Sequence, residues 1–449
     1  MPRSLLRLPG LLPLLLFACG PWGRVGEEPA PSRSGGVTQV LDPGSTYRRL
    51  GRLVGSAELP FVGDIAFYRS GGDSAVALLS VSLQTRHFAF QKDGEFFVAR
   101  YRAIWNATPA AGGPPRSSSQ EQVVRVNSFA ETQRSDESVL YQDGLVLSPG
   151  EWKVSLQIAD ELRGRKGGAQ AQVRVPAFVD GSVSAPRLVY QARGRGARSE
   201  ALGVVVNPRG SIPYGSDSLT LYLEGYAMPG PTTVPLVLVG PDGEVVGQDS
   251  IRFEGNRDVE SLAIRLRADS LPLGELRVAV GRQPADSLRA VVSFSAGWVV
   301  TNYEDMVSLL RYYQPSPALD SLRKAPQEER SRRWQAFWRA TDPNPGTSAH
   351  EGLEQYFTRV TVANLRFRDE SVEGWRTDRG EVLIRLGEPD EIFDASPQSE
   401  GRVIRWNYIQ LRLTIYFHDP TGFGRFDLTP SSRSELEQVI ARLSRQTGF

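Results

Sequence analysis

The chain has 449 residues, which is too long for one hydrophobic core; at roughly 150 residues per domain it predicts about three domains. Its 40% hydrophobic and 23% charged residues are typical of soluble globular protein and exclude wholesale disorder and a multi-spanning membrane protein. The formal net charge is only +1, so no long-range field favours a polyanion and we expect no nucleic-acid partner.

Residues 1–19 have the layout of a secretory signal peptide, with two arginines ahead of the apolar run from Leu8 to Phe17. This run is about half the roughly 20 residues that a helix needs to cross a bilayer. Its end, Leu16-Phe17-Ala18-Cys19, resembles a bacterial lipobox, in which the cysteine receives a diacylglyceryl group. We therefore predict lipidation of Cys19, with plain export and cleavage after Ala18 as the alternative.

Acylation at this position predicts where the protein is found. Two or three acyl chains on one residue give lasting membrane anchorage. Gly20 follows the cysteine in place of Asp, which under the usual sorting rule does not retain a lipoprotein in the inner membrane. We expect an exported protein of the bacterial cell envelope, lipid-anchored in the outer membrane and facing the periplasm or the surface. Residues 20–45 are rich in Pro, Gly, Ser and Arg and predict a flexible tether.

Two β domains are predicted after the tether, over residues 46–180 and 186–297. Short apolar runs with mostly period-two alternation, broken by Gly, Pro and Asp, favour strands of antiparallel sheets with one buried face. In the first domain we expect strands over 75–83, 88–90, 96–101, 123–129 and 152–158, and a long exposed loop over 110–122. The pattern favours immunoglobulin-like or fibronectin-like β-sandwiches, with other antiparallel β folds as the alternative.

A short internal repeat links the two halves. Residues 147–156 (LSPGEWKVSL) align with residues 271–280 (LPLGELRVAV). The shared pattern is Leu-x-x-Gly-Glu, a large apolar residue, a basic residue, and then large apolar residues at alternate positions. This pattern suits a turn that leads into a late strand of each of two similar sandwiches.

The C-terminal third, residues 301–449, predicts an α+β domain because its apolar period changes to about 3.6. Asn302 is a candidate N-cap of the first helix, and Ser348 with Glu351 forms a candidate capping box of the third. The aromatic residues of these helices are expected to be core and not a stacking platform. We predict helices over about 302–313, 326–339, 348–367 and 432–443, and strands over 382–386, 403–408 and 411–417.

One motif in this domain is distinctive. Gly374-Trp375-Arg376-Thr377-Asp378-Arg379-Gly380 is followed by Gly387-Glu388-Pro389-Asp390. Here the chain resembles the bacterial GWxTD-domain family over about residues 301–443. One departure is His350, where the family more often has Asn, so a cap or contact there is expected to differ. The resemblance implies an exported protein with β-rich segments ahead of the motif, and it implies no established activity.

Six of the seven residues of the motif admit a structural role. Gly374 and Gly380 would bracket a tight helix-to-strand crossing by adopting backbone angles closed to other residues. The tryptophan between them offers a large apolar anchor. Thr377 and Asp378 are short acceptors for backbone amides, and Arg379 can fork onto a carboxylate.

The alternative interpretation is a shared polar cleft. Carboxylates near arginines could perform general acid–base chemistry, although no spacing matches a known metal loop, so we expect no metal. The residues of this candidate cleft are Asp378, Arg379, Asp390, Glu351, Arg359 and Asn364.

Two functions remain open. One is a lipid-anchored envelope protein that binds or scaffolds an envelope protein partner through its C-terminal domain. The other is an envelope hydrolase using the carboxylates. One cysteine and three scattered histidines exclude a Cys/His zinc site, a disulfide framework and a CxxC redox pair. Neither a catalytic histidine nor a nucleophile elbow is evident, and no nucleotide motif is present, so we expect no cofactor and favour the binding role over an enzyme.

Overall fold

The computed structural model describes residues 43–132, 138–281, 287–346, 350–367, 372–394 and 401–446. The predicted signal peptide, Cys19 and the tether as far as residue 42 lie outside these ranges. Within them, no helix has both the length and the apolar character needed to span a bilayer. The predicted tether ends too late, because residues 43–45 belong to helix α2 (Pro43–Arg49), whose Tyr47 packs in an apolar cluster with Val291 and Val299.

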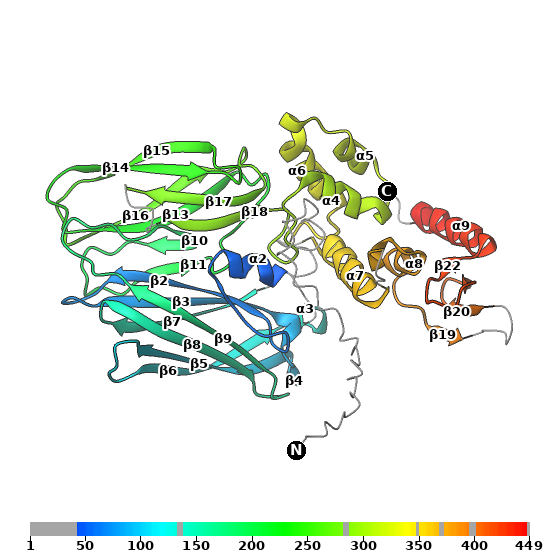
Figure 1. Cartoon of the computed structure of the whole chain (residues 1–449), viewed down its shortest axis with the longest axis horizontal. Coiled ribbons are helices and arrows are strands. Elements are labelled where there is room, and N and C mark those ends of the chain that lie inside the picture. The colour runs from blue at the N-terminus through cyan, green and yellow to red at the C-terminus, as the bar shows by residue number, and fades with distance from the viewer. Residues whose placement is uncertain are drawn as a thin grey trace, which may run out of the picture. The chain divides into compact units, whose positions relative to one another are not determined.

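The first β-sandwich has two sheets, in which every strand pair is antiparallel (Figure 1). Trp105, Leu79 and Tyr101 are fully buried in the core between them. One sheet has the order β1 (Leu53–Val54), β2 (Phe61–Arg69), β3 (Ala75–Gln84), β7 (Ser138–Leu147). The other has the order β4 (Gln91–Asp93), β5 (Phe96–Pro109), β8 (Gly150–Asp160), β9 (Lys166–Val175), and β6 (Arg116–Val126) also pairs with β5.

Two predictions for this sandwich are wrong. The expected loop over 110–122 is half strand, because β6 pairs with β5 from Arg116 onward. Its Ser- and Gln-rich start is mostly exposed, so backbone hydrogen bonds hold it and no apolar period reveals it. The expected strand at 88–90 is irregular and follows the 3-10 helix η1 (Thr85–His87). Phe88 is buried and stacks on Tyr101, with the ring centroids 5.1 Å apart. Its apolar side chain therefore marks a core position and not a strand.

The second sandwich also has two sheets. Its pairing is antiparallel except for β12 with β18, which is parallel. One sheet has the order β11 (Gly203–Val206), β10 (Arg187–Arg193), β13 (Ser218–Tyr226), β16 (Val259–Arg267). The other has the order β12 (Ser211–Pro213), β18 (Leu288–Ser293), β17 (Gly274–Val280), β14 (Thr232–Val239), β15 (Val245–Phe253).

The two sandwiches repeat one topology, of the fibronectin-like kind. The order β2-β3-β7 corresponds to β10-β13-β16, and β6-β5-β8-β9 corresponds to β15-β14-β17-β18. The ten-residue repeat marks equivalent inner strands, since β8 begins at Gly150 and β17 begins at Gly274. Both glycines have positive φ, 130° and 120°, a region that other residues rarely adopt. The predicted fold class, two β-sandwiches followed by an α+β domain, is confirmed.

The C-terminal region combines helices with a four-stranded antiparallel sheet (Figure 1). Asn302 is the N-cap of the first helix, as predicted, and accepts a hydrogen bond from the N–H of Asp305. The helical aromatic residues are core: Trp334, Phe337 and Phe357 are fully buried. The helical elements are α4 (Tyr303–Leu309), η3 (Leu310–Tyr312), α5 (Pro317–Arg323), η4 (Gln327–Glu329), α6 (Arg330–Thr341), α7 (Glu351–Phe367), η5 (Gly374–Arg376), α8 (Asp378–Leu386) and α9 (Pro430–Gln446). The strands, in sheet order, are β19 (Glu391–Asp394), β20 (Arg402–Tyr408), β21 (Leu413–Asp419) and β22 (Asp427–Leu428).

Residues 382–386 form the second half of helix α8 and not the predicted strand. Val382, Leu383 and Ile384 are all buried, so three consecutive apolar residues give no helical period and resemble a buried strand. The flanking signals are those of a helix. Thr377 is its N-cap, and Glu381 pairs with Arg385 one turn later at 2.8 Å.

The structure does not test the capping box predicted at the start of α7. The helix begins at Glu351, and Ser348 lies outside the described residues. The cap is His350, the position where the chain departs from the family it resembles. Its Nδ1 accepts from the N–H of Leu353 at 3.1 Å, and its Nε2 lies 2.9 Å from the Thr341 hydroxyl. Burial lowers the pKa of His350, which favours the neutral ring that this cap requires.

Candidate functional site

The GWxTD pentapeptide forms a 3-10 turn and the first residue of helix α8. Thr377 closes the turn by donating its hydroxyl hydrogen to the carbonyl of Gly374 at 2.7 Å. The same hydroxyl accepts the N–H of Gly380 at 3.1 Å, so one side chain ends η5 and caps α8. The motif is therefore a helix-to-helix junction and not the helix-to-strand crossing that we predicted.

Gly380 is required by space and not by unusual backbone angles. Neither Gly374 nor Gly380 has positive φ, which corrects the sequence-based interpretation. A Cβ added at Gly380 would lie 2.1 Å from the carbonyl oxygen of Gly374 and 3.0 Å from Cα of Trp375. Real Cβ atoms do not approach other atoms to within 2.1 Å, so the missing side chain allows η5 to pack on the first turn of α8.

Trp375 anchors the junction in the core. Its side chain is fully buried in the cluster that includes Leu383 and Phe357. The guanidinium of Arg376 lies over the indole ring, 4.8 Å from its centroid. The indole N–H has no hydrogen-bond partner among the described residues, so the ring contributes apolar packing as predicted.

Asp378 connects the motif to two later segments of the chain. Its carboxylate accepts the N–H of Leu428 at 2.6 Å, in β22, and pairs with Arg433 of α9 at 2.8 Å. Glu381, one turn later, also accepts from Arg433, at 3.3 Å. The expected role as an acceptor of a backbone amide is therefore found, but the amide lies 50 residues away.

Among the described residues, Arg379 has no carboxylate onto which it forks, in contrast to the prediction. Its guanidinium lies between two aromatic rings, 4.9 Å from the centroid of Phe367 and 4.5 Å from that of Phe426. It donates to the carbonyl of Gly424 at 3.3 Å. Burial lowers the pKa of this side chain, and the neighbouring Arg402 lowers it further.

Asp419 was not among the predicted site residues, yet it organises the loop beside Arg379. It has no exposed surface and accepts the N–H groups of Thr421, Gly422 and Gly424 at 3.1, 2.9 and 2.6 Å. These bonds lower its pKa against the opposing effect of burial. The tip of this loop is Phe423, 93% exposed. An Asp two residues before a hydroxyl and three before a glycine was the available sequence signal for such a turn.

A cavity of about 200 Å³ lies at the junction. Four of its lining residues are arginines and two are aspartates, so its walls are polar and basic. Two of the six candidate cleft residues, Asp378 and Arg379, line it. The full lining is Arg366, Phe367, Val372, Arg376, Thr377, Asp378, Arg379, Gly424, Arg425, Phe426 and Asp427.

The structure does not bring the other candidate residues to this cavity. Arg359 donates to the Ile384 carbonyl at 3.3 Å, near the C-terminal end of α8, and this carbonyl is about 9 Å along the helix from Asp378. Asp390 is beyond that end, and its carboxylate accepts the N–H of Ile409 at 2.6 Å.

The last two candidates lie toward opposite ends of α7, about 20 Å apart along its axis. Glu351 begins the helix and accepts from the side-chain amide of Asn344 at 3.4 Å. Asn364 is 3% exposed, and its amide oxygen has no partner among the described residues. The six residues therefore lie at several separate places.

Comparison with known proteins gives one family. Residues 284–419 match the GWxTD domain, a span that starts ahead of β18 and ends at Asp419. No curated protein matches the chain.

Similar solved structures were found, and three of them share 8–12% identity with this chain. Dimeric latent PorU from Porphyromonas gingivalis is 10% identical, with 56% of this chain and 21% of that chain covered and a TM-score of 0.22. Trypsin-activated alpha-2-macroglobulin from Escherichia coli is 12% identical, with 56% and 18% covered and a TM-score of 0.18. The calcium-binding domain CBD12 of CALX1.1 is 8% identical, with 49% and 79% covered and a TM-score of 0.13. The chain thus spans about a fifth of the length of the first two proteins.

Proposed function

We propose that this GWxTD domain-containing protein is a lipid-anchored cell-envelope protein that binds or scaffolds an envelope protein partner. The family itself implies no established activity. In this proposal the acyl chains on Cys19 hold it at the membrane, and the C-terminal domain makes the contact. The layout of residues 1–19 supports the anchor, since a short apolar run ends in a lipobox-like sequence with the chain's one cysteine.

The contacts of the motif favour binding over hydrolysis. Asp378 and Glu381 share Arg433, and Asp378 also holds a backbone amide, so both carboxylates are engaged within the domain. The three histidines of the chain do not line the cavity beside the motif. A general acid–base pair needs side chains that can reach a substrate proton, and these residues are committed to holding α8, β22 and α9 together.

The exposed loop tip carries the proposal. Phe423 is 93% exposed, yet the loop that presents it is held by the hydrogen bonds to Asp419. A large aromatic side chain on a pre-organised backbone loses little conformational entropy on binding and is a frequent interface anchor. The loop joins β21 to β22, and on one face of their sheet Phe393 and Tyr416 lie to either side of Arg405. These two aromatic residues are 41% and 38% exposed.

A pull-down from detergent-solubilised envelopes tests this proposal with the full chain as bait. We expect a stoichiometric protein partner that Phe423→Ser reduces at least tenfold. Leu365→Ser is the matched control, because Leu365 is 75% exposed on α7 and should not matter. Equal recovery by Phe423→Ser would contradict the role of the loop. No partner with any bait, together with turnover of a glycan or ester panel, would favour the envelope hydrolase.

The anchor is tested separately. Cys19→Ala removes the acylated sulfur, so we expect the protein to move from the membrane to the soluble fraction. Unchanged membrane retention of this variant would count against acylation and leave the partner proposal to its own test.

A further inference from the structure

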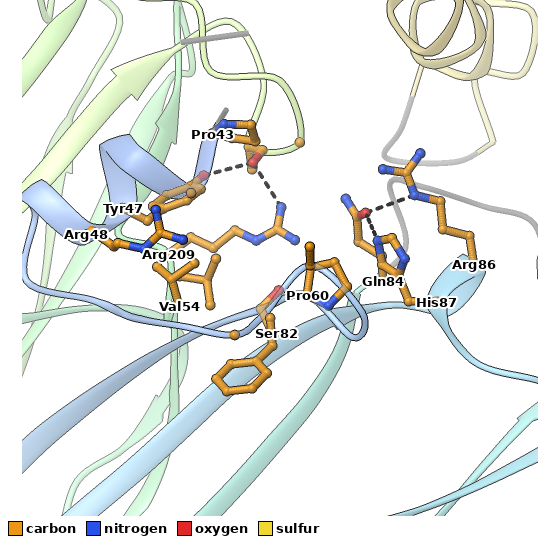
Figure 2. A pocket seen from close by; sticks show the side chains of 17 residues that line it. Pro43, Tyr47, Arg48, Val54, Pro60, Ser82, Gln84, Arg86, His87 and Arg209 are labelled. Carbon is orange, nitrogen blue, oxygen red and sulfur yellow. Dashed lines mark hydrogen bonds between the residues drawn. The ribbon is translucent and has the colours of Figure 1, made fainter. Parts of the chain in front are cut away.

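A second cavity, of about 300 Å³, lies where α2 meets the two sandwiches (Figure 2). Its lining comes from α2, from the segment between Val54 and Val62, from β3 and the η1 turn after it, from Arg209, and from Ala296 and Gly297. Four basic side chains line it, and among the described residues that line it there is no carboxylate. These four are Arg48, Arg86, His87 and Arg209.

Arg209 is a buried cation without an anion. It is 8% exposed, and Figure 2 shows its side chain extending into the pocket between Tyr47 and Pro60. It donates to the carbonyl of Ala296 at 3.0 Å, which also accepts the Tyr47 hydroxyl at 2.8 Å. Its Nε has no partner, and in the described ranges no carboxylate pairs with it. Burying an unpaired charge is costly, so the site is complementary to an anion.

The opposite wall adds a fixed set of hydrogen-bonding groups. The side-chain Oε1 of Gln84 accepts from Nε of Arg86 and is 3.1 Å from Nε2 of His87 (Figure 2). These contacts fix all three side chains. Burial lowers the pKa of His87 to about 4, and nearby arginines contribute to this shift. The ring is therefore neutral at pH 7, and the arginines supply the positive charge.

One carboxylate, that of Glu354, acts on this wall from outside the lining. Glu354 influences Arg86 electrostatically, but it accepts the indole N–H of Trp298 at 2.9 Å and is not part of the lining. Arg48 and Arg86 are both exposed, and neither forms an ion pair with a carboxylate elsewhere in the described structure. Three arginines thus line one cavity, and no carboxylate is among the described residues of its lining.

We infer that this cavity binds a phosphate group, carried either by a small solute or by a lipid headgroup, with Arg209 at its base and Arg48 and Arg86 at its rim. Guanidinium forks match the tetrahedral oxygens of phosphate and form charge-assisted hydrogen bonds with them. A dianionic phosphate suits three arginines better than a single carboxylate does. The inference does not depend on the proposed partner or on acylation.

Isothermal titration of the full chain with inorganic phosphate tests the site. Cys19→Ser is used throughout so that no acyl chain inserts into lipid. We expect Arg48→Gln and Arg86→Gln each to weaken binding about tenfold, the effect of losing one charge-assisted contact. Arg49→Gln is the matched control, since it removes the same charge from the neighbouring exposed position of α2, which does not line the cavity. Arg209→Gln should abolish binding, and the two exposed variants keep the test decisive if this buried variant fails to fold.

Vesicles distinguish the two sources of phosphate. Binding to phosphatidylglycerol vesicles but not to inorganic phosphate, with the same sensitivity to Arg48→Gln and Arg86→Gln, would assign a lipid headgroup. Binding to inorganic phosphate would assign a solute and should raise the pKa of His87 in an NMR titration while leaving that of His350 unchanged. Binding to neither probe, or equal weakening by Arg49→Gln, would overturn the inference.

Discussion

Gly380→Ala should destabilise the C-terminal domain, although alanine normally stabilises a helix. The new Cβ would lie 2.1 Å from the Gly374 carbonyl oxygen and 3.0 Å from Cα of Trp375. Both are backbone atoms, so no side-chain rotation relieves the contact. The 3-10 turn must move by about 1 Å to restore an ordinary contact distance, and that movement displaces the fully buried Trp375 and strains the Thr377 cap.

The expected magnitude follows from two opposing effects. Overpacking of a well-packed core costs typically about 1–3 kcal/mol, and the clash with backbone places this site at the upper end. Replacing glycine by alanine in a helix returns about 1 kcal/mol. The net loss of unfolding free energy should therefore be about 2 kcal/mol.

Denaturant unfolding monitored by tryptophan fluorescence measures this loss, and Gly352→Ala is the matched control. Gly352 is also helical, near the start of α7, but a Cβ there would be 3.4 Å from the nearest atom, an ordinary contact. This control should be neutral or stabilised by up to about 1 kcal/mol. Equal stability of the two variants would refute the argument that close backbone approach selects glycine at position 380.

The remaining predictions concern buried charges and caps. Arg195→Met should lower the free energy of unfolding, measured with denaturant, by about 3–5 kcal/mol. Arg195 donates two hydrogen bonds of 2.8 Å to the carboxylate of Glu224, which is 0% exposed and would be left without its cation. A loss under about 1 kcal/mol would show that the pair is not desolvated. Asp378→Ala should lower the free energy of unfolding by about 1.5–3 kcal/mol. Most of this loss comes from the charge-assisted hydrogen bond to the Leu428 amide, because the ion pair with Arg433, which is 43% exposed, contributes less. Unchanged stability with loss of partner binding would instead make Asp378 a binding residue. The lowered pKa of His350 means that the unfolded chain takes up its proton first, so unfolding free energy should fall as the pH drops below about 6.5. His350→Asn keeps an acceptor for the cap and should show a smaller fall; identical pH profiles would contradict the role of the neutral ring.

Local signals in the sequence predicted much of the fold. Period-two alternation identified β5 and β8, because one face of each of these strands is buried and the other is more exposed. The ten-residue repeat located equivalent strands, since both must begin with a glycine at positive φ. Asn302 was recognisable as an N-cap because capping depends on residues only three apart.

The errors arose where burial is not one-sided. Helix α8 buries Val382, Leu383 and Ile384 in succession, which hides the helical period. Strand β6 is exposed along most of its length, which hides the strand period. In both cases tertiary contacts on neighbouring elements decide the structure, and periodicity does not report them.

The sequence by itself determined which side chains were available for chemistry, and the tertiary structure decided what each one contacts. Asp378 was recognisable as an amide acceptor, but the amide of Leu428 lies 50 residues away. Arg209 carried no sequence signal at all, because a cation is unusual only when it is buried without an anion. Residue types and short spacings encode local bonds, whereas partners distant in the chain are chosen by packing, which only the folded molecule specifies.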